Sequence, residues 1–476
     1  MKTKIRNRPI LFLLEESIFK RLKDEVQLNN EIHLKGEKRI KLDIACYFIH
    51  LISYQEAKAN DKADNGFVIL NAKILQKQHH NYKVYFNFLI EKAFIEFRTY
   101  SIKKKISKSY KIIKPKTRHY KFVKYDPEGF VFKRNLKKGY DARAVRADKS
   151  CKHLTKWLSP EFLSIDYDNA VNYVNSAKMK DSKKYQRRWI IEMINEEYIY
   201  YQRQGKDNRL HSILTNMPKD LRPFLRFKYK PMVSLDIKAS QPYLFAGLLK
   251  FIFLDRDVAH IDKYLNTIIK KDTRESVEDT IHTVMIKESL KRADIKEIEE
   301  FIFLIENKDI YSYIGANFSE EFLYSIQTPI GISDKFYKKN LGFTITETFD
   351  TLRKYSKTLM LEFLYCSIPK DETRFKDRYK ELKRILPNKI SELAEKLKSE
   401  DNSVFPIFLQ NIEAYLIIDL ITKGIALKNP EIPMYTIHDS IATTHEYASL
   451  IKEELTNQLF KYNGVKPQIT IEEWKG

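Results

Sequence analysis

The sequence predicts an α+β protein, in which helices and short antiparallel strands occupy separate stretches of the chain. Apolar residues recur at helical spacing over 72–75 and 84–93. Residues 233–238 instead alternate between apolar and polar side chains, which is the period of a strand with one buried face. Residues 434–437 and 441–444 are two further β-prone runs around a short turn, and they predict a hairpin.

Composition and periodicity divide the chain into four regions, and its 476 residues suffice for two to four domains. Residues 1–125 combine two helical segments with a strand at Phe94–Tyr100 and an extended segment at Ser109–Ile113. Two helices followed by a basic-tipped hairpin are the outline of a winged helix, and a small α+β support domain is the alternative. The remaining regions are a basic linker at 126–150, a helical stretch at 151–207 and the motif-bearing part at 208–476.

The chain is strongly basic, with a formal net charge of +22 and a pI near 9.4. Such an excess favours a polyanionic partner, because phosphate binding releases counterions. Residues 101–140 hold fourteen Lys or Arg against two acidic residues, with Tyr and Phe interleaved. We therefore expect nucleic-acid contact there, whereas a solvated face is the ordinary alternative. The basic side chains at the tip are Lys103, Lys104, Lys105 and Lys108.

A membrane surface is the competing partner for a basic chain, but the sequence does not favour membrane binding. The apolar stretch after Pro9 is broken by Glu15 and Glu16, so we expect no signal peptide. No uninterrupted apolar run approaches the ~20 residues that cross a bilayer. The three cysteines are odd in number and far apart, which predicts neither disulfides nor a zinc site and suits a reducing cytoplasm. Glycine is scarce, and we find no P-loop or dinucleotide fingerprint.

Two aspartates lie where a predicted strand meets a turn. Asp236 is on the polar face of the strand 233–238, just before Ala239-Ser-Gln-Pro242 breaks it and a helix follows. Asp439 lies at the tip of the predicted hairpin. Each alone is more often a cap or a turn former. Two such carboxylates brought together can instead bind two divalent cations, which activate a hydroxyl and stabilise a transferring phosphoryl group.

A third motif lies between the aspartates. Arg353, Lys357, Leu361 and Tyr365 are spaced by four, so they share one helix face. Two cations followed by an apolar and an aromatic residue suit a nucleoside triphosphate. An ordinary surface helix is the alternative.

Together these motifs resemble the polymerase core shared by family A DNA polymerases and single-subunit phage-type RNA polymerases. The resemblance covers residues 208–476: 233–241 resembles motif A, 353–365 the motif B helix and 435–440 motif C. Smaller matches in the same order are Arg209-Leu-His-Ser212, Lys308-Asp-Ile-Tyr311 and Gln410.

The resemblance implies a right-hand architecture. An antiparallel palm would be built from 208–250 and 425–476, helical fingers from about 290–400, and a thumb from 151–207. It implies two Mg²⁺ ions, with Mn²⁺ as a substitute, held by Asp236, Asp439 and the backbone carbonyl of Ile237. The nucleotide-binding residues it implies are Arg353, Lys357, Leu361, Tyr365, Gln241 and His438. Arg209 and Gln410 would contact the primer–template duplex.

Four positions depart from the family pattern. Gln241 stands where the DNA enzymes usually carry glutamate, and Ser440 where they carry a second glutamate, as the RNA enzymes do. Cys366 replaces a glycine and Leu361 an aromatic residue. These changes leave the metal ligands in place but bear on the choice of sugar.

The prediction is therefore a cytoplasmic, template-directed DNA polymerase of a phage, plasmid or other mobile replicon, acting on primer, template and nucleoside triphosphates. Residues 1–207 show no second acidic set for a proofreading exonuclease. A phage-type RNA polymerase is the first alternative, and an inactive polymerase-like replication protein that binds DNA is the second.

Overall fold

The computed structural model describes residues 12–36, 38–59, 65–100, 108–115, 117, 119–254, 292–327, 352–368, 374–398 and 401–475. Lys103, Lys104 and Lys105, predicted to contact nucleic acid, lie outside these ranges, and so do parts of the predicted fingers.

Helices and antiparallel strands make up the described chain, as the α+β prediction expects. Every strand pair with a defined register is antiparallel. The chain forms two compact units: unit 1 comprises 1–202, 211–232 and 474–476, and unit 2 comprises 203–210 and 233–473. The division falls inside strand β10 (Lys230–Ile237) rather than at the predicted boundary of 207/208. The predicted palm segment 208–250 is therefore shared between the units.

Unit 1 contains the N-terminal elements and the helices that follow them. In chain order these are β1 (Phe12–Glu15), α1 (Glu16–Ile32), α2 (Leu42–Ala59), β2 (Val68–Ile69), α3 (Ala72–Gln78), α4 (Tyr82–Glu91), β3 (Ile95–Arg98), β4 (Ser109–Ile112), β5 (Phe122–Tyr125), α5 (Phe130–Thr155), β6 (Leu163–Ile165), α6 (Tyr167–Ser176), α7 (Asp181–Asn195), β7 (Tyr201–Gln202), β8 (His211–Ser212), the 3₁₀ helix η2 (Lys219–Phe224) and β9 (Leu225–Phe227).

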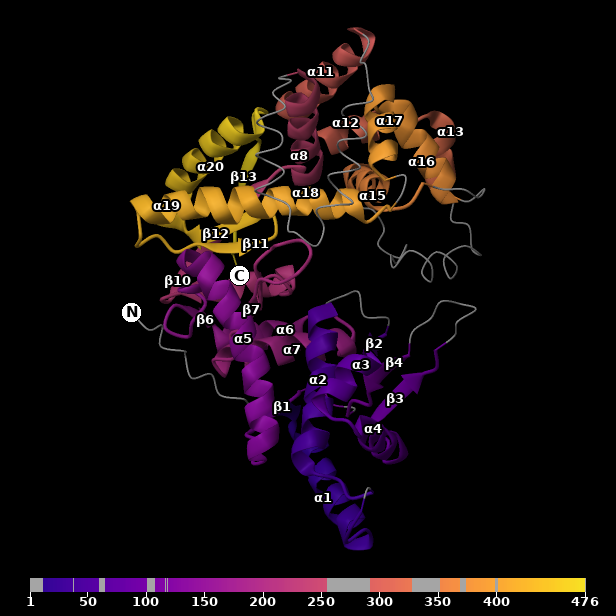
Figure 1. The fold of residues 1–476 in the computed structure, drawn as a ribbon, viewed down its shortest axis with the longest axis vertical. Coiled ribbons are helices and arrows are strands. Elements are labelled where there is room, and N and C mark those ends of the chain that lie inside the picture. Colours follow the sequence, from indigo (N-terminus) through magenta and orange to yellow (C-terminus); the bar gives the residue numbers. More distant parts are fainter. Residues whose placement is uncertain are drawn as a thin grey trace. The chain divides into compact units, whose positions relative to one another are not determined.

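The N-terminal part of unit 1 contains the predicted helices and hairpin. Helices α3 and α4 cover the two segments of helical spacing, and Asn71 caps α3 by accepting a hydrogen bond from the backbone N–H of Lys73 at 2.9 Å. Strands β3 and β4 form the hairpin, and β2 pairs with the other edge of β4, which gives the order β2-β4-β3. Helix α2 packs against β2 and β4 and supplies many of the buried residues of this core (Figure 1).

Most of the predicted linker at 126–150 lies in the 26-residue helix α5, which we did not expect from the sequence. Among the lysines and arginines of α5 runs a stripe of small and apolar side chains, which are three, four or eight residues apart and therefore recur after one or two helical turns. Its members are Leu136, Ala144, Ala147, Cys151 and Leu154, all buried.

Helix α7, in the predicted thumb region, shares its core with the predicted N-terminal domain. The hydroxyls of Tyr185 and Ser53 lie 3.1 Å apart, and Nε2 of Gln186 donates a hydrogen bond to the carbonyl of Glu56 at 2.8 Å. Trp189 on the same helix is 2% exposed. The described parts of 1–125 and residues 151–202 therefore belong to one compact unit, whereas 203–207 belong to unit 2.

Unit 2 contains the three sequence motifs. Its elements are the end of β10, α8 (Ser240–Leu249), the π-helical turn η3 (Lys250–Leu254), α11 (Arg292–Asn307), α12 (Ile310–Ala316), α13 (Glu320–Gln327), α15 (Leu352–Tyr365), α16 (Arg374–Ile385), α17 (Asn388–Leu397), α18 (Val404–Ala414), the π-helical turn η4 (Tyr415–Ile421), α19 (Thr422–Lys428), β11 (Tyr435–Ile437), β12 (Ser440–Thr444), the 3₁₀ turn η5 (His445–Tyr447), α20 (Ala448–Asn463) and β13 (Ile469–Glu473).

A long continuous helix, Val404–Lys428, is the central helix of unit 2. Helices α8, α15 and α20 pack against it (Figure 1). By length and composition alone this helix could cross a membrane, although several polar residues interrupt its apolar sequence. In the structure 67% of its most apolar window is buried, as expected for the central helix of a packed core.

A glycine allows α8 and α20 to pack closely behind the sheet. A Cβ atom at Gly247 would lie 1.9 Å from Oδ1 of Asn463, so no side chain fits there. Nδ2 of Asn463 donates a hydrogen bond to the carbonyl of Tyr243 at 3.2 Å. This contact fixes α8, and with it the turn that follows Asp236, against the C-terminal helix.

Candidate active site

Asp236 lies near the end of β10, as its alternating sequence predicts. The strand pairs with β13, and Asp236 lies opposite Thr470 in the register. Val233, Leu235 and Ile237 are buried, whereas Asp236 is half-buried. Ala239 then takes a left-handed conformation, with φ 48° and ψ 46°, and α8 begins at the next residue. The chain thus turns from strand to helix within two residues of Ile237.

Asp439 lies in the two-residue turn of the β11–β12 hairpin. Ile437 and Ser440 are paired across the hairpin, so His438 and Asp439 alone form its tip. His438 has a φ of 57°, a left-handed value that such a tight turn requires. The hydroxyl of Ser440 donates a hydrogen bond to the carbonyl of Ile437 at 2.9 Å and closes the turn. Asp439 is left half-buried at the tip.

The structure brings the two aspartate-bearing turns together. Strand β12 is the neighbour of β10 in the sheet. Oγ of Ser240, four residues after Asp236, donates a hydrogen bond to Oδ2 of Asp439 at 2.5 Å. Oγ of Ser234 donates a longer one, of 3.4 Å, to Oδ2 of Asp236. The motifs that resemble A and C therefore meet at one edge of the sheet, although 199 residues separate Ser240 from Asp439 in the chain.

The atoms at this edge are oxygen donors: two carboxylates and nearby hydroxyl and backbone carbonyl groups. Mg²⁺ and Mn²⁺ prefer such ligands, so the residues present fit a hard divalent ion. Within the described ranges, no three His, Cys, Asp or Glu side chains are grouped for metal binding. An ion here would be held by two carboxylates and complete its shell with water or substrate oxygens, which Mg²⁺ accepts readily.

Helix α15 presents the predicted face to the surface. Arg353 and Lys357 are exposed, and Leu361 and Tyr365 are half-buried. The opposite side packs into unit 2 through Tyr355, Ser356, Leu359, Met360, Glu362, Phe363 and Leu364, which are all buried. The four residues with a spacing of four therefore form one accessible stripe, as predicted.

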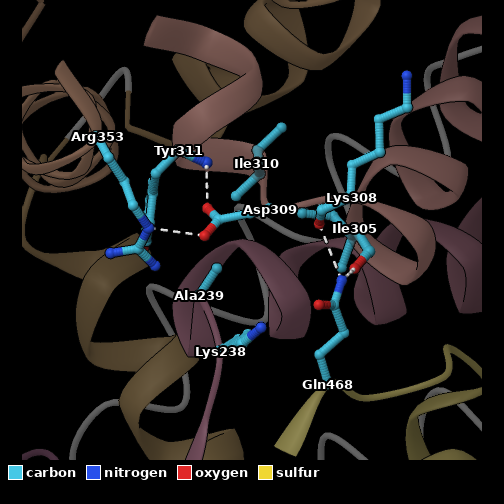
Figure 2. Close-up of a pocket in the computed structure, with 9 residues that line it drawn as sticks. All are labelled: Lys238, Ala239, Ile305, Lys308, Asp309, Ile310, Tyr311, Arg353 and Gln468. Atoms are coloured by element: carbon cyan, nitrogen blue, oxygen red, sulfur yellow. Dashed lines mark hydrogen bonds and ion pairs between the residues drawn. The ribbon is translucent and has the colours of Figure 1, made fainter. Parts of the chain in front are cut away.

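Arg353 is held by a carboxylate from the segment that precedes α12. Its Nε donates a hydrogen bond to Oδ2 of Asp309 at 2.7 Å, and its guanidinium lies 5.7 Å from the ring centre of Tyr311. Figure 2 shows Arg353, Asp309 and Tyr311 beside Lys238 and Ala239 of the strand-to-helix turn, around one small pocket. Burial opposes the ionisation of Asp309, but Arg353 and two backbone N–H groups outweigh it and hold its pKa below the ordinary value.

Tyr311 connects the α15 stripe to the aspartate edge. It is 4% exposed, and burial raises the pKa of its hydroxyl well above the ordinary value. The negative charges of Asp439 and Asp309 raise that pKa further. One pocket is lined by Tyr311 and Arg353 and by Lys238 and Ala239 of the turn after Asp236, so the Arg353 pair lies beside the aspartate edge.

Sequence reasoning missed Glu413, the most buried acid of the site. It lies on α18 and is 1% exposed. Its two oxygens accept hydrogen bonds from Nε and Nη2 of Arg209, both at 2.7 Å, and Oε2 also accepts one from Nε2 of Gln241 at 2.8 Å. Burial raises the pKa of Glu413 to about 7 even though Arg209 favours its ionised form. We call Arg209, Gln241 and Glu413 the Glu413 network.

Gln410, predicted to contact duplex, lies one turn before Glu413 and is hydrogen-bonded to Tyr365. Burial raises the pKa of the Tyr365 hydroxyl to about 12. The structure thus joins the predicted duplex contacts, Arg209 and Gln410, to the predicted nucleotide contacts, Gln241 and Tyr365. A signal for Glu413 existed in the sequence, because an acid inside an apolar helix is rarely buried without a partner.

Of the four lysines at the predicted basic hairpin, Lys108 alone is described. It is exposed at the start of β4, with its Nζ 4.9 Å from the ring centre of Phe97 and 5.3 Å from that of Tyr110. It belongs to unit 1, whereas the aspartate edge belongs to unit 2.

No protein-family model matches the chain, and no curated protein matches it. Among solved structures, the chain is similar to the POL domain of Pol1 from M. smegmatis, in complex with DNA primer-template and dNTP. The identity is 9% and the TM-score 0.34, and the match covers 65% of this chain and 56% of that one. It spans little more than half of that chain, and at this TM-score it assigns neither fold nor activity.

Proposed function

We propose that the chain is a template-directed nucleotidyltransferase, and specifically a DNA polymerase. One observation carries the proposal: the hydrogen bond from Ser240 to Asp439 joins the turn after Asp236 to the tip of the hairpin. Two carboxylates at one sheet edge, with a cationic helix stripe near them, suit the transfer of a nucleotide to a 3′ hydroxyl.

Each group has a distinct role in this proposal. Asp236, Asp439 and the backbone carbonyl of Ile237 would hold the divalent ions, which supply charge stabilisation for the transferring phosphoryl group. Arg353 and Lys357 bind the phosphates of the incoming nucleotide. The rest of the site has positioning roles: Leu361, Tyr365, Gln241 and His438 contact the nucleotide, and Arg209 and Gln410 the duplex.

Unit 1 supplies the contact to nucleic acid outside the active site. The strand order β2-β4-β3, together with helices α2, α3 and α4, supports a winged-helix-like assignment for 1–125. In the sequence, Lys103, Lys104, Lys105 and Lys108 fall between β3 and β4. We propose that 151–207 acts as the thumb. The three cysteines are free, which suits a cytoplasmic enzyme, and a mobile replicon is the proposed source.

A primed-template extension assay tests the function. Purified protein, Mg²⁺ and a labelled primer are incubated with dNTPs or with NTPs, and the products are sized. Extension with dNTPs supports a DNA polymerase, and extension with NTPs alone assigns the RNA polymerase. DNA binding without extension assigns the inactive replication protein. Longer incubation of a mismatched primer tests for the expected lack of proofreading.

A further inference from the structure

We propose that Glu413 is a positioning residue for sugar selection, because it fixes the side-chain amide of Gln241 in one orientation. The inference rests on the proposed function and names a residue that neither the motifs nor the resemblance includes. It is carried by the hydrogen bonds of the Glu413 network.

The orientation follows from the chemistry of the two groups. Above its pKa of about 7 Glu413 is a carboxylate, which only accepts hydrogen bonds, whereas an amide donates through its nitrogen and accepts through its oxygen. Nε2 of Gln241 must therefore be the atom that faces Glu413, and it lies 2.8 Å from Oε2. Oε1 of Gln241 is then directed away from Glu413. It is buried, and no donor among the described residues reaches it.

Arg209 holds Glu413 itself in place. Its two hydrogen bonds of 2.7 Å make a bidentate pair, which fixes the plane of the carboxylate as well as its position. Glu413 is 1% exposed and Gln241 5% exposed, so water does not compete freely for these bonds. The negative charges of Asp207 and Asp439 also act on Glu413.

These hydrogen bonds limit the movement of the Gln241 side chain, which we expect to lie under the sugar of the incoming nucleotide. Gln241 lies in the first turn of α8, just after the turn that follows Asp236. In the DNA polymerases that motif A resembles, a bulky side chain at this position packs under the sugar and excludes a 2′ hydroxyl, and we expect Gln241 to form the same wall. A glutamine tethered at its amide end presents one fixed shape, whereas an untethered one can rotate or flip. Glu413→Gln removes the acceptor-only partner, since an amide at 413 pairs with either end of Gln241.

The experiment measures the ratio of kcat/KM for a dNTP to that for the matching NTP, at one template position. In Glu413→Gln we expect the discrimination, whichever sugar is preferred, to fall by about tenfold or more. In a Gln241→Ala background the same substitution should change the ratio by less than about threefold, because Glu413 acts through Gln241. The swap variant Gln241→Glu with Glu413→Gln restores one carboxylate–amide pair and should recover most of the discrimination.

Thermal unfolding of each variant and its Kd for primer–template DNA accompany the kinetics. The swap breaks the bidentate pair between residue 413 and Arg209, which is expected to contact the duplex. Recovered sugar discrimination together with weaker duplex binding would therefore separate the effect of Glu413 on Gln241 from its effect on Arg209. The inference is overturned if Glu413→Gln leaves the ratio unchanged, if it shifts the ratio equally without Gln241, or if the swap recovers nothing. It is also overturned if the wild type scarcely discriminates. A wild type that extends no primer with either nucleotide defeats the proposed function first, which is a separate result.

Discussion

Arg353 and Asp309 form an ion pair of 2.7 Å at the edge of the proposed nucleotide site, and Asp309 is at the same time the N-cap of α12. Oδ1 of Asp309 accepts hydrogen bonds from the backbone N–H groups of Tyr311 and Ser312, while Oδ2 accepts the one from Arg353. The cation assigned to the triphosphate is thus paired with a carboxylate of the chain itself. The pair is half-exposed, so a triphosphate can replace Asp309 at modest cost.

The first prediction concerns this cationic stripe. Arg353→Ala and Lys357→Ala should each lower kcat/KM for the nucleotide by about tenfold or more, with little change in DNA binding. Asp309→Asn should lower KM, because asparagine still caps α12 but no longer competes for Arg353. Steady-state kinetics measure both effects, and Lys354→Ala, exposed on α15 outside the stripe, is the matched control. Unchanged kinetics in both alanine variants would contradict nucleotide binding by α15 and would indicate an ordinary surface helix.

The second prediction concerns the aspartate edge. Asp236→Asn or Asp439→Asn should reduce incorporation by several orders of magnitude, because the loss of metal costs several kcal/mol of barrier. Duplex binding, measured by fluorescence anisotropy, should change little, since lysines and arginines elsewhere carry it. Asp377→Asn, exposed on α16, is the control for loss of a carboxylate. A variant that keeps more than about a tenth of the wild-type rate contradicts the metal assignment.

The site elements that sequence predicted are those whose pattern is local. Alternation located β10, the turn residues located the break before α8, and a spacing of four located the accessible stripe of α15. The hairpin around Asp439 followed from two β-prone runs in the same way. These features depend on neighbours within a few residues, so one sequence suffices to find them.

What sequence missed depends on contacts between distant residues. Glu413 lies 204 residues from Arg209 and 172 from Gln241, and no local rule pairs them. Helix α5 was missed because basic residues outnumber its buried stripe of Leu136, Ala144 and Ala147. The unit boundary inside β10 was missed because one strand pairs with β9 at its start and with β13 at its end.

The third prediction concerns the basic hairpin of unit 1. Deleting 1–125 is a poor test, because it would expose the face of α7 that packs on α2. Replacing Lys103, Lys104, Lys105 and Lys108 by alanine removes the charge and leaves that core intact. DNA affinity should fall, and the slope of log K against log salt should become shallower by about 0.9 for each duplex phosphate that the protein no longer neutralises. A titration in increasing salt measures it, and an unaltered slope would mean that the lysines are merely solvated.

The fourth prediction follows from the buried carboxylate of Glu413. Burial raises its pKa from the ordinary 4.5 to about 7, with Asp439 and Asp207 adding to the rise and Arg209 opposing it. The folded chain thus holds this proton more tightly than the unfolded chain does. The stability contribution is fully present below pH 4.5 and is lost as pH rises through about 7.

Glu413→Gln should remove that part of the pH dependence. Between about pH 5 and pH 8 the variant's unfolding free energy should fall less than the wild type's, by a difference on the order of 2–3 kcal/mol. Chemical denaturation at each pH measures it, and Glu431→Gln, an exposed position, is the control. Parallel pH profiles for wild type and Glu413→Gln would contradict the raised pKa.

The last prediction is a preference for deoxynucleotides. Gln241 is nearly as large as the glutamate that stands at this position in the DNA polymerases whose motif A it matches. Its side chain is buried and hydrogen-bonded to Glu413. A fixed side chain of that size leaves no room for a 2′ hydroxyl, whereas Gln241→Gly opens the space. The glycine variant should therefore raise ribonucleotide insertion by about 10–1000-fold, or ~1.4–4 kcal/mol, which is the scale of one steric clash.

Ser440, the feature shared with the RNA enzymes, should not matter for this choice. Its hydroxyl is engaged with the carbonyl of Ile437 inside the hairpin, and the side chain is 1% exposed. A buried glutamate there would disturb the turn through its charge, so Ser440→Ala is the cleaner substitution. It should leave the ratio of dNTP to NTP insertion near the wild-type value while Gln241→Gly changes it. A wild-type enzyme that prefers NTPs would contradict the exclusion of a 2′ hydroxyl by Gln241, because the tethered glutamine would then accommodate that hydroxyl. Such a result would favour the RNA polymerase.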